Sequence, residues 1–304
     1  MADARKHDIL LESGTNELNI LVFDIAGNAF GINVAKVKNL LQYVPIQPMP
    51  RAHPNIEGIF KPRDQVLTVV DLAGYMGLPA TEDISRDILI VTSFNQMNMA
   101  FHVHKVERIW RISWSDIEKP DPTIYGGTDG IITGITRIDS RIISIVDFEK
   151  IIFDISPATG IQFEEIERLG ERDSNIKPIM VVEDSELLRR MILESLNMAG
   201  YTDVSLFTNG KDAWDRLVEI RDQKEPLEKI VSLVITDIEM PLMDGHHLTK
   251  RIKTDPVLRK LPVVIFSSLI DAQMRIKGEE VGCDAQLSKP EIGLLVQTVD
   301  KLMQ

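Results

Sequence analysis

The sequence has a single cysteine, Cys283, so it cannot form an intramolecular disulfide and suits a reducing compartment. The segment from Met1 to Glu12 has neither the basic-then-apolar pattern of a secretion signal nor an apolar run near the ~20 residues that a membrane span requires. The formal net charge is -12, which argues against the clustered Lys and Arg of a nucleic-acid surface. These absences predict a cytoplasmic protein with no nucleic-acid partner and no direct membrane insertion.

The remaining composition is that of a folded protein, with 26% charged and 44% hydrophobic residues. A length of 304 residues is enough for two domains, each with its own core. We predict a flexible arm at residues 1–16, an all-β domain at 17–155, a helical connector at 156–176 and an α/β domain at 177–304. Within the connector, Ile161 to Asp173 is expected to form an acid-rich helix with Ile166 and Leu169 on one side.

The first half contains short strand patterns and an internal repeat. Strands at 19–24 and 29–34 flank a turn at Ala26-Gly27-Asn28, which predicts a hairpin. Residues 58–60 and 66–72 are echoed by residues 134–136 and 142–148, at one constant offset of 76. Two related β units predict two small sheets or barrels on a common core, because short strands hide their edges by closing. The alternative is a chance similarity between two hairpins.

No catalytic motif is visible in residues 1–155, which contain no Gly-rich phosphate loop and no nucleophile elbow. His102 and His104 alternate on a predicted strand and so share a face from which both could reach one metal ion. No further ligands are identified for them, and the favoured interpretation is that they are ordinary structural histidines.

Residues 18–150 resemble the CheW family of chemotaxis coupling proteins in two segments, L-V-F-D-I-A-G-N-A-F-G-I-N-V-A-K-V and N-I-E-G-I-F-K-P-R-D-Q-V-L-T-V-V-D-L. The resemblance implies two intertwined five-stranded barrels that bind the histidine kinase CheA and methyl-accepting chemoreceptors. It also implies partner contacts at Gly58 and Arg63. The family's N-L-R-G tetrad is replaced here by residues 60–64, so a solvated turn charge is the alternative for Arg63.

The second half alternates strands with helices, a pattern that predicts a doubly wound sheet of five parallel strands. The expected strands are 179–182, 204–207, 231–236, 263–266 and 285–287, and the expected helices are 185–198, 211–221, 248–254, 272–281 and 292–302. In such a sheet, right-handed crossovers gather the carboxyl ends of the strands at one edge, where α/β proteins place their chemistry.

Polar residues follow four of these strands: Glu183 and Asp184, then Asp237, then Ser267, then Lys289. Three converging carboxylates repel one another, so we expect a hard divalent cation, for which Mg²⁺ is suited. Asp237 is then the candidate nucleophile for a phosphoryl group, with Lys289 and Ser267 binding the phosphoryl oxygens. Taken singly, each of these residues has a plainer interpretation as a helix cap or a surface charge.

Residues 177–304 resemble the receiver domain of two-component response regulators, which is flavodoxin-like in fold. The resemblance implies Asp237 as phosphoacceptor, Glu183, Asp184, Asp237 and the backbone carbonyl of Glu239 as Mg²⁺ ligands, and Ser267 and Lys289 as phosphoryl-binding switch residues. Gln286 stands where many receivers have an aromatic switch residue. In that family, Glu239 and Leu269 occupy positions that tune dephosphorylation.

A CheW-like domain followed by a receiver resembles the arrangement of the CheV family. This implies a non-enzymatic adaptor at chemoreceptor arrays, in which phosphorylation of Asp237 changes the coupling of receptor to CheA and supplies adaptation. An alternative is a phosphate sink that drains CheA while the β domain only localises it. A third possibility, an enzymatic β domain regulated by the receiver, is disfavoured because no catalytic motif is visible there.

Overall fold

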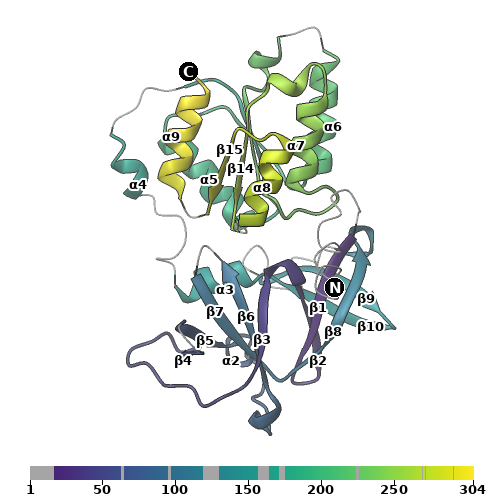
Figure 1. Ribbon diagram of the computed structural model, residues 1–304, viewed down its shortest axis with the longest axis vertical. Helices are drawn as coiled ribbons and strands as arrows, with labels where there is room; N and C mark the ends of the chain where they lie inside the picture. Colours follow the sequence, from purple (N-terminus) through teal and green to yellow (C-terminus); the bar gives the residue numbers. More distant parts are fainter. Residues whose placement is uncertain are drawn as a thin grey trace. The chain divides into compact units, whose positions relative to one another are not determined.

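The computed structural model describes residues 17–62, 65–94, 97–118, 130–156, 164–170, 175–223, 226–268, 270, 272–289 and 291–304. The chain divides into two compact units, one spanning Glu17–Pro157 and the other containing Ala158–Gln304. The colour bar of Figure 1 separates them, since the first runs from purple to teal and the second from teal to yellow. None of the helices in the ranges above combines the length and the apolar character that crossing a membrane requires.

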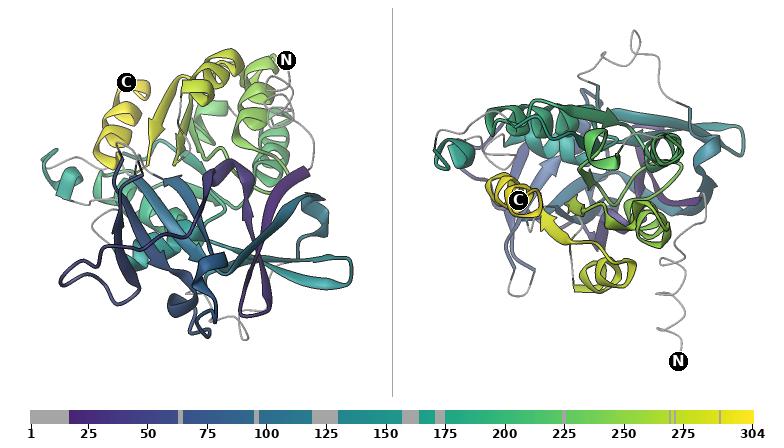
Figure 2. Two further views of the ribbon diagram at one scale, coloured as in Figure 1. Left: turned by 60° about the horizontal axis from the view of Figure 1, so that its bottom comes forward. Right: turned by 90° about the horizontal axis from the view of Figure 1, so that it is seen from above.

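The first unit consists of two five-stranded sheets, with strand orders β8-β1-β2-β10-β9 and β3-β6-β7-β5-β4. The strands are β1 (Glu17–Ile25), β2 (Asn28–Asn33), β3 (Val37–Gln42), β4 (Ile56–Phe60), β5 (Leu67–Asp71), β6 (Ile88–Phe94), β7 (Met97–Val103), β8 (Lys105–Ser113), β9 (Ile132–Ile138) and β10 (Arg141–Val146). The chain changes sheet after β2 and again after β7, so each half of the unit contributes to both sheets (Figures 1 and 2). This arrangement confirms the predicted pair of intertwined five-stranded β units.

The predicted hairpin is formed by β1 and β2, in which Asp24 pairs with Ala29 and Ile25 pairs with Asn28. The two turn residues, Ala26 and Gly27, have φ angles of 52° and 81°. Positive φ at both central residues is what a type I′ turn requires, and such turns match the twist of the flanking strands.

Some strands of this unit, β1 and β5 among them, are buried on both faces because each face covers a different core. On β1, Leu21, Phe23 and Ile25 enter a large cluster that includes residues of both sheets, whereas Ile20 and Val22 enter a smaller cluster within their own sheet. The other sheet has its own small cluster around Val69, Leu89 and Ala100. Each sheet therefore packs on a core of its own and on a core that the two share, which fixes their pairing.

The internal repeat is also visible in three dimensions. Both copies form an antiparallel hairpin, β4–β5 in one case and β9–β10 in the other. The aspartate that ends each copy caps a helix: Asp71 accepts the Gly74 N–H at 2.8 Å at the start of α2 (Leu72–Tyr75), and Asp147 accepts the Lys150 N–H at 3.0 Å at the start of α3 (Phe148–Ile155). The matching hairpins and caps favour a true internal repeat over a chance similarity.

The glycine that begins each copy of the repeat has a backbone role. Gly58 has a φ of +149°, and a Cβ there would overlap the carbonyl oxygen of Gln47, which bridges to Ile59. A Cβ on Gly134 would likewise overlap the side chain of Ile117. A neighbouring segment thus passes close to each hairpin, and only glycine leaves room for it.

The second unit contains the predicted parallel sheet, with strand order β12-β11-β13-β14-β15. Its strands are β11 (Ile179–Val182), β12 (Val204–Phe207), β13 (Leu233–Thr236), β14 (Val263–Ser267) and β15 (Ala285–Ser288). Its longer helices are α5 (Glu186–Met198), α6 (Gly210–Arg221), α7 (Gly245–Thr254), α8 (Ala272–Val281) and α9 (Ile292–Leu302). α5 packs with α9, and α7 packs with both α6 and α8, so helices cover both faces of the sheet (Figures 1 and 2).

Short 3-10 turns complete both units. They lie at Val34–Lys36, Ile84–Arg86, Trp114–Asp116, Leu227–Lys229 and Leu258–Lys260. The turn at Leu227–Lys229 explains why β13 begins two residues later than predicted, because the Val231 N–H bonds to the Leu227 carbonyl at 2.8 Å instead of joining the sheet. α7 begins three residues earlier than predicted, since the Asp244 side chain caps it through the His247 N–H at 2.8 Å.

The predicted connector helix ends earlier than expected. Of the segment from Ile161 to Asp173, the described part contains one turn of helix, α4 (Glu164–Glu167), and the following Gly170 has a φ of +83°. A left-handed glycine of this kind is typical after the end of a helix, so the helix does not continue through Gly170. Ile166 is buried, and α4 contacts α5 and α9 of its own unit.

Candidate functional site

Four of the five side chains predicted to meet at the carboxyl edge of the sheet, those of Glu183, Asp184, Asp237 and Lys289, do meet there. Glu183 and Asp184 follow β11, and Asp237 follows β13, where its N–H bonds to the Val182 carbonyl at 2.9 Å. One carboxylate oxygen from each lies within 4.8 Å of the others. Glu183 and Asp237 are buried, while Asp184 is exposed and forms the solvent side of the group.

Lys289 supplies the positive charge of this pocket. Its Nζ lies 2.7 Å from Glu183 Oε2 and 3.3 Å from Asp237 Oδ2, and its side chain is 2% exposed. Its backbone N–H bonds to the carbonyl of Ser267 at 3.1 Å, so the end of β14 fixes the position from which the lysine enters. Removing either the ammonium or its carboxylate partners would leave an uncompensated buried charge, which is strongly destabilising.

The pocket carries more negative charge than Lys289 can balance. Burial raises the pKa of Glu183 well above its usual range. Lys289 opposes this rise, whereas the charges of Asp237 and Asp184 add to it. The site therefore favours the binding of a further cation. Without one, the three carboxylates repel one another.

Asp237 is oriented by its own turn. Its Oδ1 accepts the N–H of Ile238 at 2.7 Å, which leaves Oδ2 toward Lys289. Its backbone carbonyl accepts the Thr236 hydroxyl at 2.9 Å, and a Cβ on Gly245 would overlap that carbonyl oxygen. Gly245 therefore permits the tight return of the chain toward Asp237, and the D-G pair in the sequence is the signal for it.

Arg189 was not predicted from the sequence to belong to the site. Its Nη1 donates to the carbonyl of Glu183 at 2.8 Å and to that of Asp184 at 3.2 Å, so it holds the backbone of the acidic pair from α5. The sequence offers only a weak signal, namely an arginine one turn after the Ser185 cap.

Ser267 ends β14 and is 1% exposed, at the same edge of the sheet as the carboxylates. Glu239 follows Asp237 in the same turn, so its carbonyl stays a predicted metal ligand. Leu269 lies outside the described residues.

Gln286, at the position where the family resemblance implied an aromatic switch residue, makes a different contact. Its Nε2 donates to the carbonyl of Arg275 at 2.8 Å, which ties β15 to α8. A Cβ on Gly278 would overlap the Gln286 side chain, so the glycine makes room for it.

The residues present fit a hard divalent cation. All donors in the acidic group are carboxylate oxygens, which Mg²⁺ prefers, and the exposed Asp184 leaves positions for water. A bound cation would also offset the excess negative charge that raises the pKa of Glu183.

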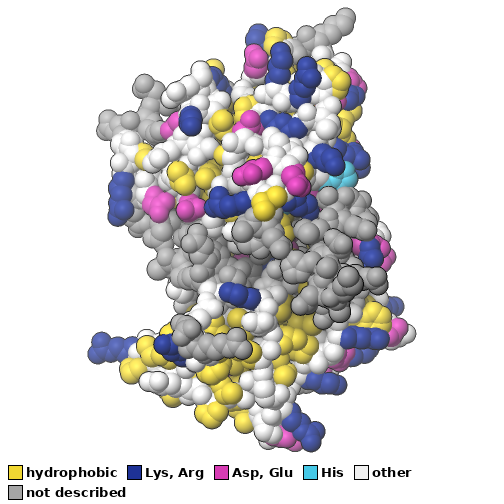
Figure 3. Space-filling model, in the orientation of Figure 1, with side chains coloured by type: hydrophobic (Ala, Val, Ile, Leu, Met, Phe, Trp, Pro, Cys, Tyr) yellow, Lys and Arg dark blue, Asp and Glu magenta, His cyan; other side chains and the backbone are white. Residues whose placement is uncertain are grey.

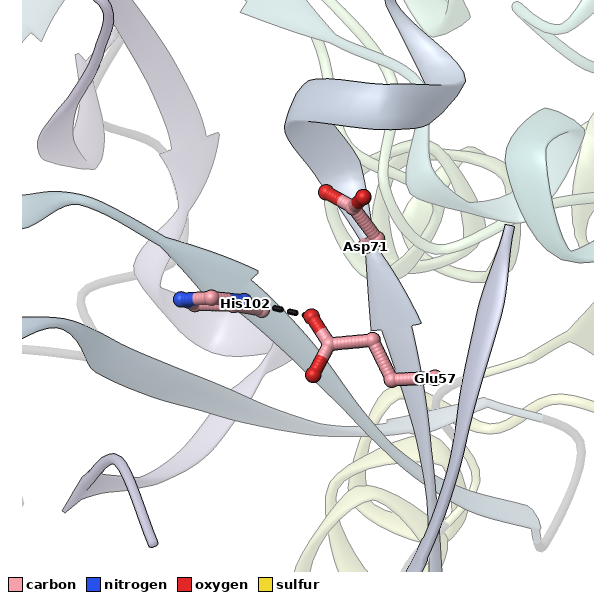
Figure 4. A group of neighbouring side chains, drawn as sticks. All are labelled: Glu57, Asp71 and His102. Atoms are coloured by element: carbon pink, nitrogen blue, oxygen red, sulfur yellow. Dashed lines mark hydrogen bonds and ion pairs between the residues drawn. The ribbon is translucent and has the colours of Figure 1, made fainter. Parts of the chain in front are cut away.

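A second cluster lies in the first unit, where Figure 4 shows Glu57 pointing toward His102 with Asp71 close by. His102 Nδ1 lies 2.5 Å from Glu57 Oε1, and its Nε2 lies 2.7 Å from Asp87 Oδ2. The Tyr43 ring packs on the imidazole at 4.4 Å between centroids. Glu57, Asp71 and His102 have ligand atoms within 4.8 Å of one another, but both ring nitrogens are already paired, which favours an ion-pair network over a metal site.

His104 takes no part in that network. Its Nδ1 accepts the N–H of Ala26, in the turn between β1 and β2, at 3.0 Å. The structure therefore separates the two histidines that the alternating pattern had placed on one face.

The two predicted partner contacts of the first unit have different outcomes. Gly58 has the backbone role described above, and its partner role stays a prediction. Arg63 lies outside the described residues.

Comparison with known proteins agrees with this architecture. Residues 19–156 match the CheW-like domain family, and residues 179–300 match the response regulator receiver domain family. The chemotaxis protein CheV3 of Helicobacter pylori is 28% identical, over 100% of this chain and 99% of that protein. CheV2 of the same organism is 28% identical over 91% and 92%, and its CheY1 is 30% identical over 37% of this chain and 84% of CheY1.

The two sheets of the first unit and the acidic pocket of the second define a two-domain signalling protein, with a CheW-like domain followed by a receiver domain. The chain belongs to the CheV-type chemotaxis coupling proteins.

The His102 network makes the stability of the CheW-like domain dependent on pH. Burial lowers the pKa of His102, but the hydrogen bonds and charges of Glu57 and Asp87 outweigh it, so the pKa is raised above 6.5. The stabilisation is therefore complete below the pKa of the unfolded chain and is lost as pH rises through the raised value. We expect His102→Gln to cost about 1 kcal/mol more at about pH 6 than at about pH 9 in urea unfolding.

His104→Gln is the matched control for this experiment. It removes a neighbouring imidazole that has no carboxylate partner among the described residues. The two variants are compared at both pH values, and a His102→Gln cost that does not fall between about pH 6 and about pH 9 would contradict the ion-pair network.

Removing Lys289 should strongly destabilise the receiver domain in the presence of a chelator. Lys289→Met leaves Glu183 and Asp237 buried without their cation, which costs about 3–5 kcal/mol in the free energy of unfolding. Adding Glu183→Gln to Lys289→Met should recover part of that loss, because the uncompensated charge is removed. Chemical unfolding of the three proteins measures both effects, and a Lys289→Met protein as stable as the parent would refute the pairing.

Proposed function

We propose that this protein is a non-enzymatic adaptor at chemoreceptor arrays, where it couples methyl-accepting receptors to the histidine kinase CheA. Phosphorylation of its receiver domain at Asp237 adjusts that coupling and so supplies adaptation. The observation that carries the proposal is the pocket of Glu183, Asp184, Asp237 and Lys289 in a chain that also contains a CheW-like domain. The names of the similar proteins, which include chemotaxis proteins CheV3 and CheW, support the pathway.

In the proposed reaction the Asp237 carboxylate acts as nucleophile toward the phosphorus of phosphorylated CheA. A bond forms between an Asp237 oxygen and phosphorus, the phosphorus–nitrogen bond of phosphohistidine breaks, and the released imidazole takes a proton from water. The Ile238 N–H fixes the carboxylate in one orientation before attack, so little ordering is required at that moment.

Charge compensation around the phosphoryl group comes from two sides. Lys289, whose Nζ is already 3.3 Å from Asp237 Oδ2, is positioned to bind a phosphoryl oxygen. Ser267 is buried at the adjacent strand end and offers a hydroxyl donor. Mg²⁺ held by Glu183, Asp184, Asp237 and the Glu239 carbonyl would supply further positive charge to the phosphoryl oxygens.

The CheW-like domain supports a docking role through its exposed apolar surface. Its large hydrophobic residues with more than two fifths of their surface exposed are Leu40, Met49, Val66, Ile84, Ile109 and Ile142. Figure 3 shows apolar side chains gathered over one face of this unit. The second unit also has large hydrophobic residues of this exposure, such as Ile176 and Ile276, so the gathering of the side chains and not their number favours docking. Exposed apolar side chains of this kind favour contact with protein partners, here the kinase and the receptors.

Adaptation in cells tests the proposal, with Asp237→Asn as the variant. Replacing the phosphoacceptor should leave receptor–kinase coupling intact but slow the return of kinase output to its baseline after a stimulus step, several-fold relative to the parent. Asp203→Asn, which changes an exposed carboxylate of the same domain, is the control and should adapt as the parent does. The readout is the time course of kinase activity after the step.

The opposite pattern would contradict the adaptor and favour the phosphate sink. In that case Asp237→Asn leaves adaptation unchanged, while phosphoryl transfer from CheA to other response regulators increases.

A further inference from the structure

The segment that precedes the receiver sheet is attached to the receiver domain at two points. At the first, Ile166 of α4 is 3% exposed, and α4 contacts α5 and α9. At the second, the Asn175 N–H bonds to the Gly200 carbonyl at 2.7 Å, and the Asn175 carbonyl accepts the Thr202 N–H at 3.3 Å. This segment is the only covalent link between the CheW-like domain and the phosphorylation pocket.

Glu165 makes the most specific of these contacts. Its Oε2 accepts the backbone N–H of Gly293 at 3.0 Å, in the first turn of α9. Glu291, the residue at the N-cap of α9, makes no side-chain capping bond of its own and instead accepts the Ser288 N–H at 3.1 Å. A carboxylate from α4 therefore caps α9, where the helix dipole also favours negative charge.

Gly293 is the residue that permits this cap. A Cβ at position 293 would lie 3.0 Å from both Cβ and Oε2 of Glu165. Any larger residue would push the Glu165 side chain away. Glycine inside a helix is less favourable than alanine, so its presence here is explained by the contact and not by the helix.

The cap lies close to the phosphorylation pocket along the chain. Gly293 is four residues after Lys289, whose Nζ contacts Glu183 and Asp237 and whose N–H bonds to the Ser267 carbonyl. Only a few residues of chain therefore separate the pocket lysine from the capped glycine.

We propose that the bond from Gly293 to Glu165 is a phosphorylation-sensitive latch that holds the connecting segment on the receiver domain. The latch rests on the proposed function, because it requires a phosphoryl group at Asp237. A phosphoryl dianion competes with Glu183 for the Lys289 ammonium, since charge-assisted bonds to phosphate are strong. As Lys289 shifts, the start of α9 moves with it, Glu165 loses the Gly293 N–H, and the connecting segment is released.

Amide hydrogen exchange on the full chain tests the latch. Acetyl phosphate with Mg²⁺ is the phosphodonor, and the intact mass of each protein reports phosphorylation separately. Phosphorylation of the parent should reduce protection of residues 164–170 about tenfold. Glu165→Ala should show that loss without phosphorylation, and Glu165→Gln, which keeps an acceptor without the charge, should be intermediate.

Two further variants separate the latch from a general effect on folding. Glu194→Ala removes an exposed carboxylate from α5 and should behave as the parent does. Gly293→Ala improves the helix propensity of α9 but displaces Glu165, so residues 164–170 should lose protection while α9 keeps or gains it.

The outcomes for the two proposals are distinct. A phosphorylated parent with unchanged protection at 164–170, or a Gly293→Ala protein with full protection there, would overturn the latch and leave phosphorylation at Asp237 intact. Absence of phosphorylation in the parent would instead overturn the proposed function, and the latch with it.

Discussion

The ammonium of Lys289 lies between the carboxylates of Glu183 and Asp237, and the loops at the strand ends of the receiver domain converge on it. Without this charge, two side chains with residue exposures of 1% and 6% would face each other as buried anions. Burial raises the pKa of Glu183 even with Lys289 present, and the carboxylates of the pocket carry more negative charge than Lys289 balances. A divalent cation or a phosphoryl group bound here would therefore change the charges that act on Lys289.

In the CheW-like domain, by contrast, the core is apolar and the buried charged network is fully paired. Strands such as β1 and β5 are buried on both faces, since each sheet packs on its own core and on the core shared with the other sheet, whereas β3 and much of β8 are not buried. The buried imidazole of His102 has carboxylates on both ring nitrogens, which leaves it fully paired. We interpret this domain as a rigid binding unit and the receiver pocket as the responsive part of the protein.

Much of this organisation could be predicted from the sequence, because it depends on local signals. The strand patterns placed β11 and β12 at their observed bounds, and the strand ends identified the residues that meet at the sheet edge. The repeat predicted paired β units because the same core positions recur in both copies, with Val69 in one small cluster and Ile145 in the other.

Other features depend on contacts between residues far apart in the chain. The pairing joins His102 on β7 to Glu57 on β4 and to Asp87 just before β6, and alternation along a single strand could not reveal it. The predicted end of the connector helix was wrong because the acidic pattern suits a helix beyond Glu167, whereas α4 ends there and is followed by the left-handed Gly170. Glu165 as a cap for α9 could not be inferred either, since the two residues are distant in sequence.

The central claim is that Asp237 accepts a phosphoryl group from the chemotaxis kinase. The most direct test is to incubate the purified full chain with radiolabelled, phosphorylated CheA and Mg²⁺, and to follow the label from kinase to adaptor over time. The account predicts that the label moves to the unmodified protein and not to Asp237→Asn, and that it is lost from the protein at alkaline pH, as an acyl phosphate is. Label that stays on CheA with the unmodified protein, or that transfers equally to Asp237→Asn, would contradict the account.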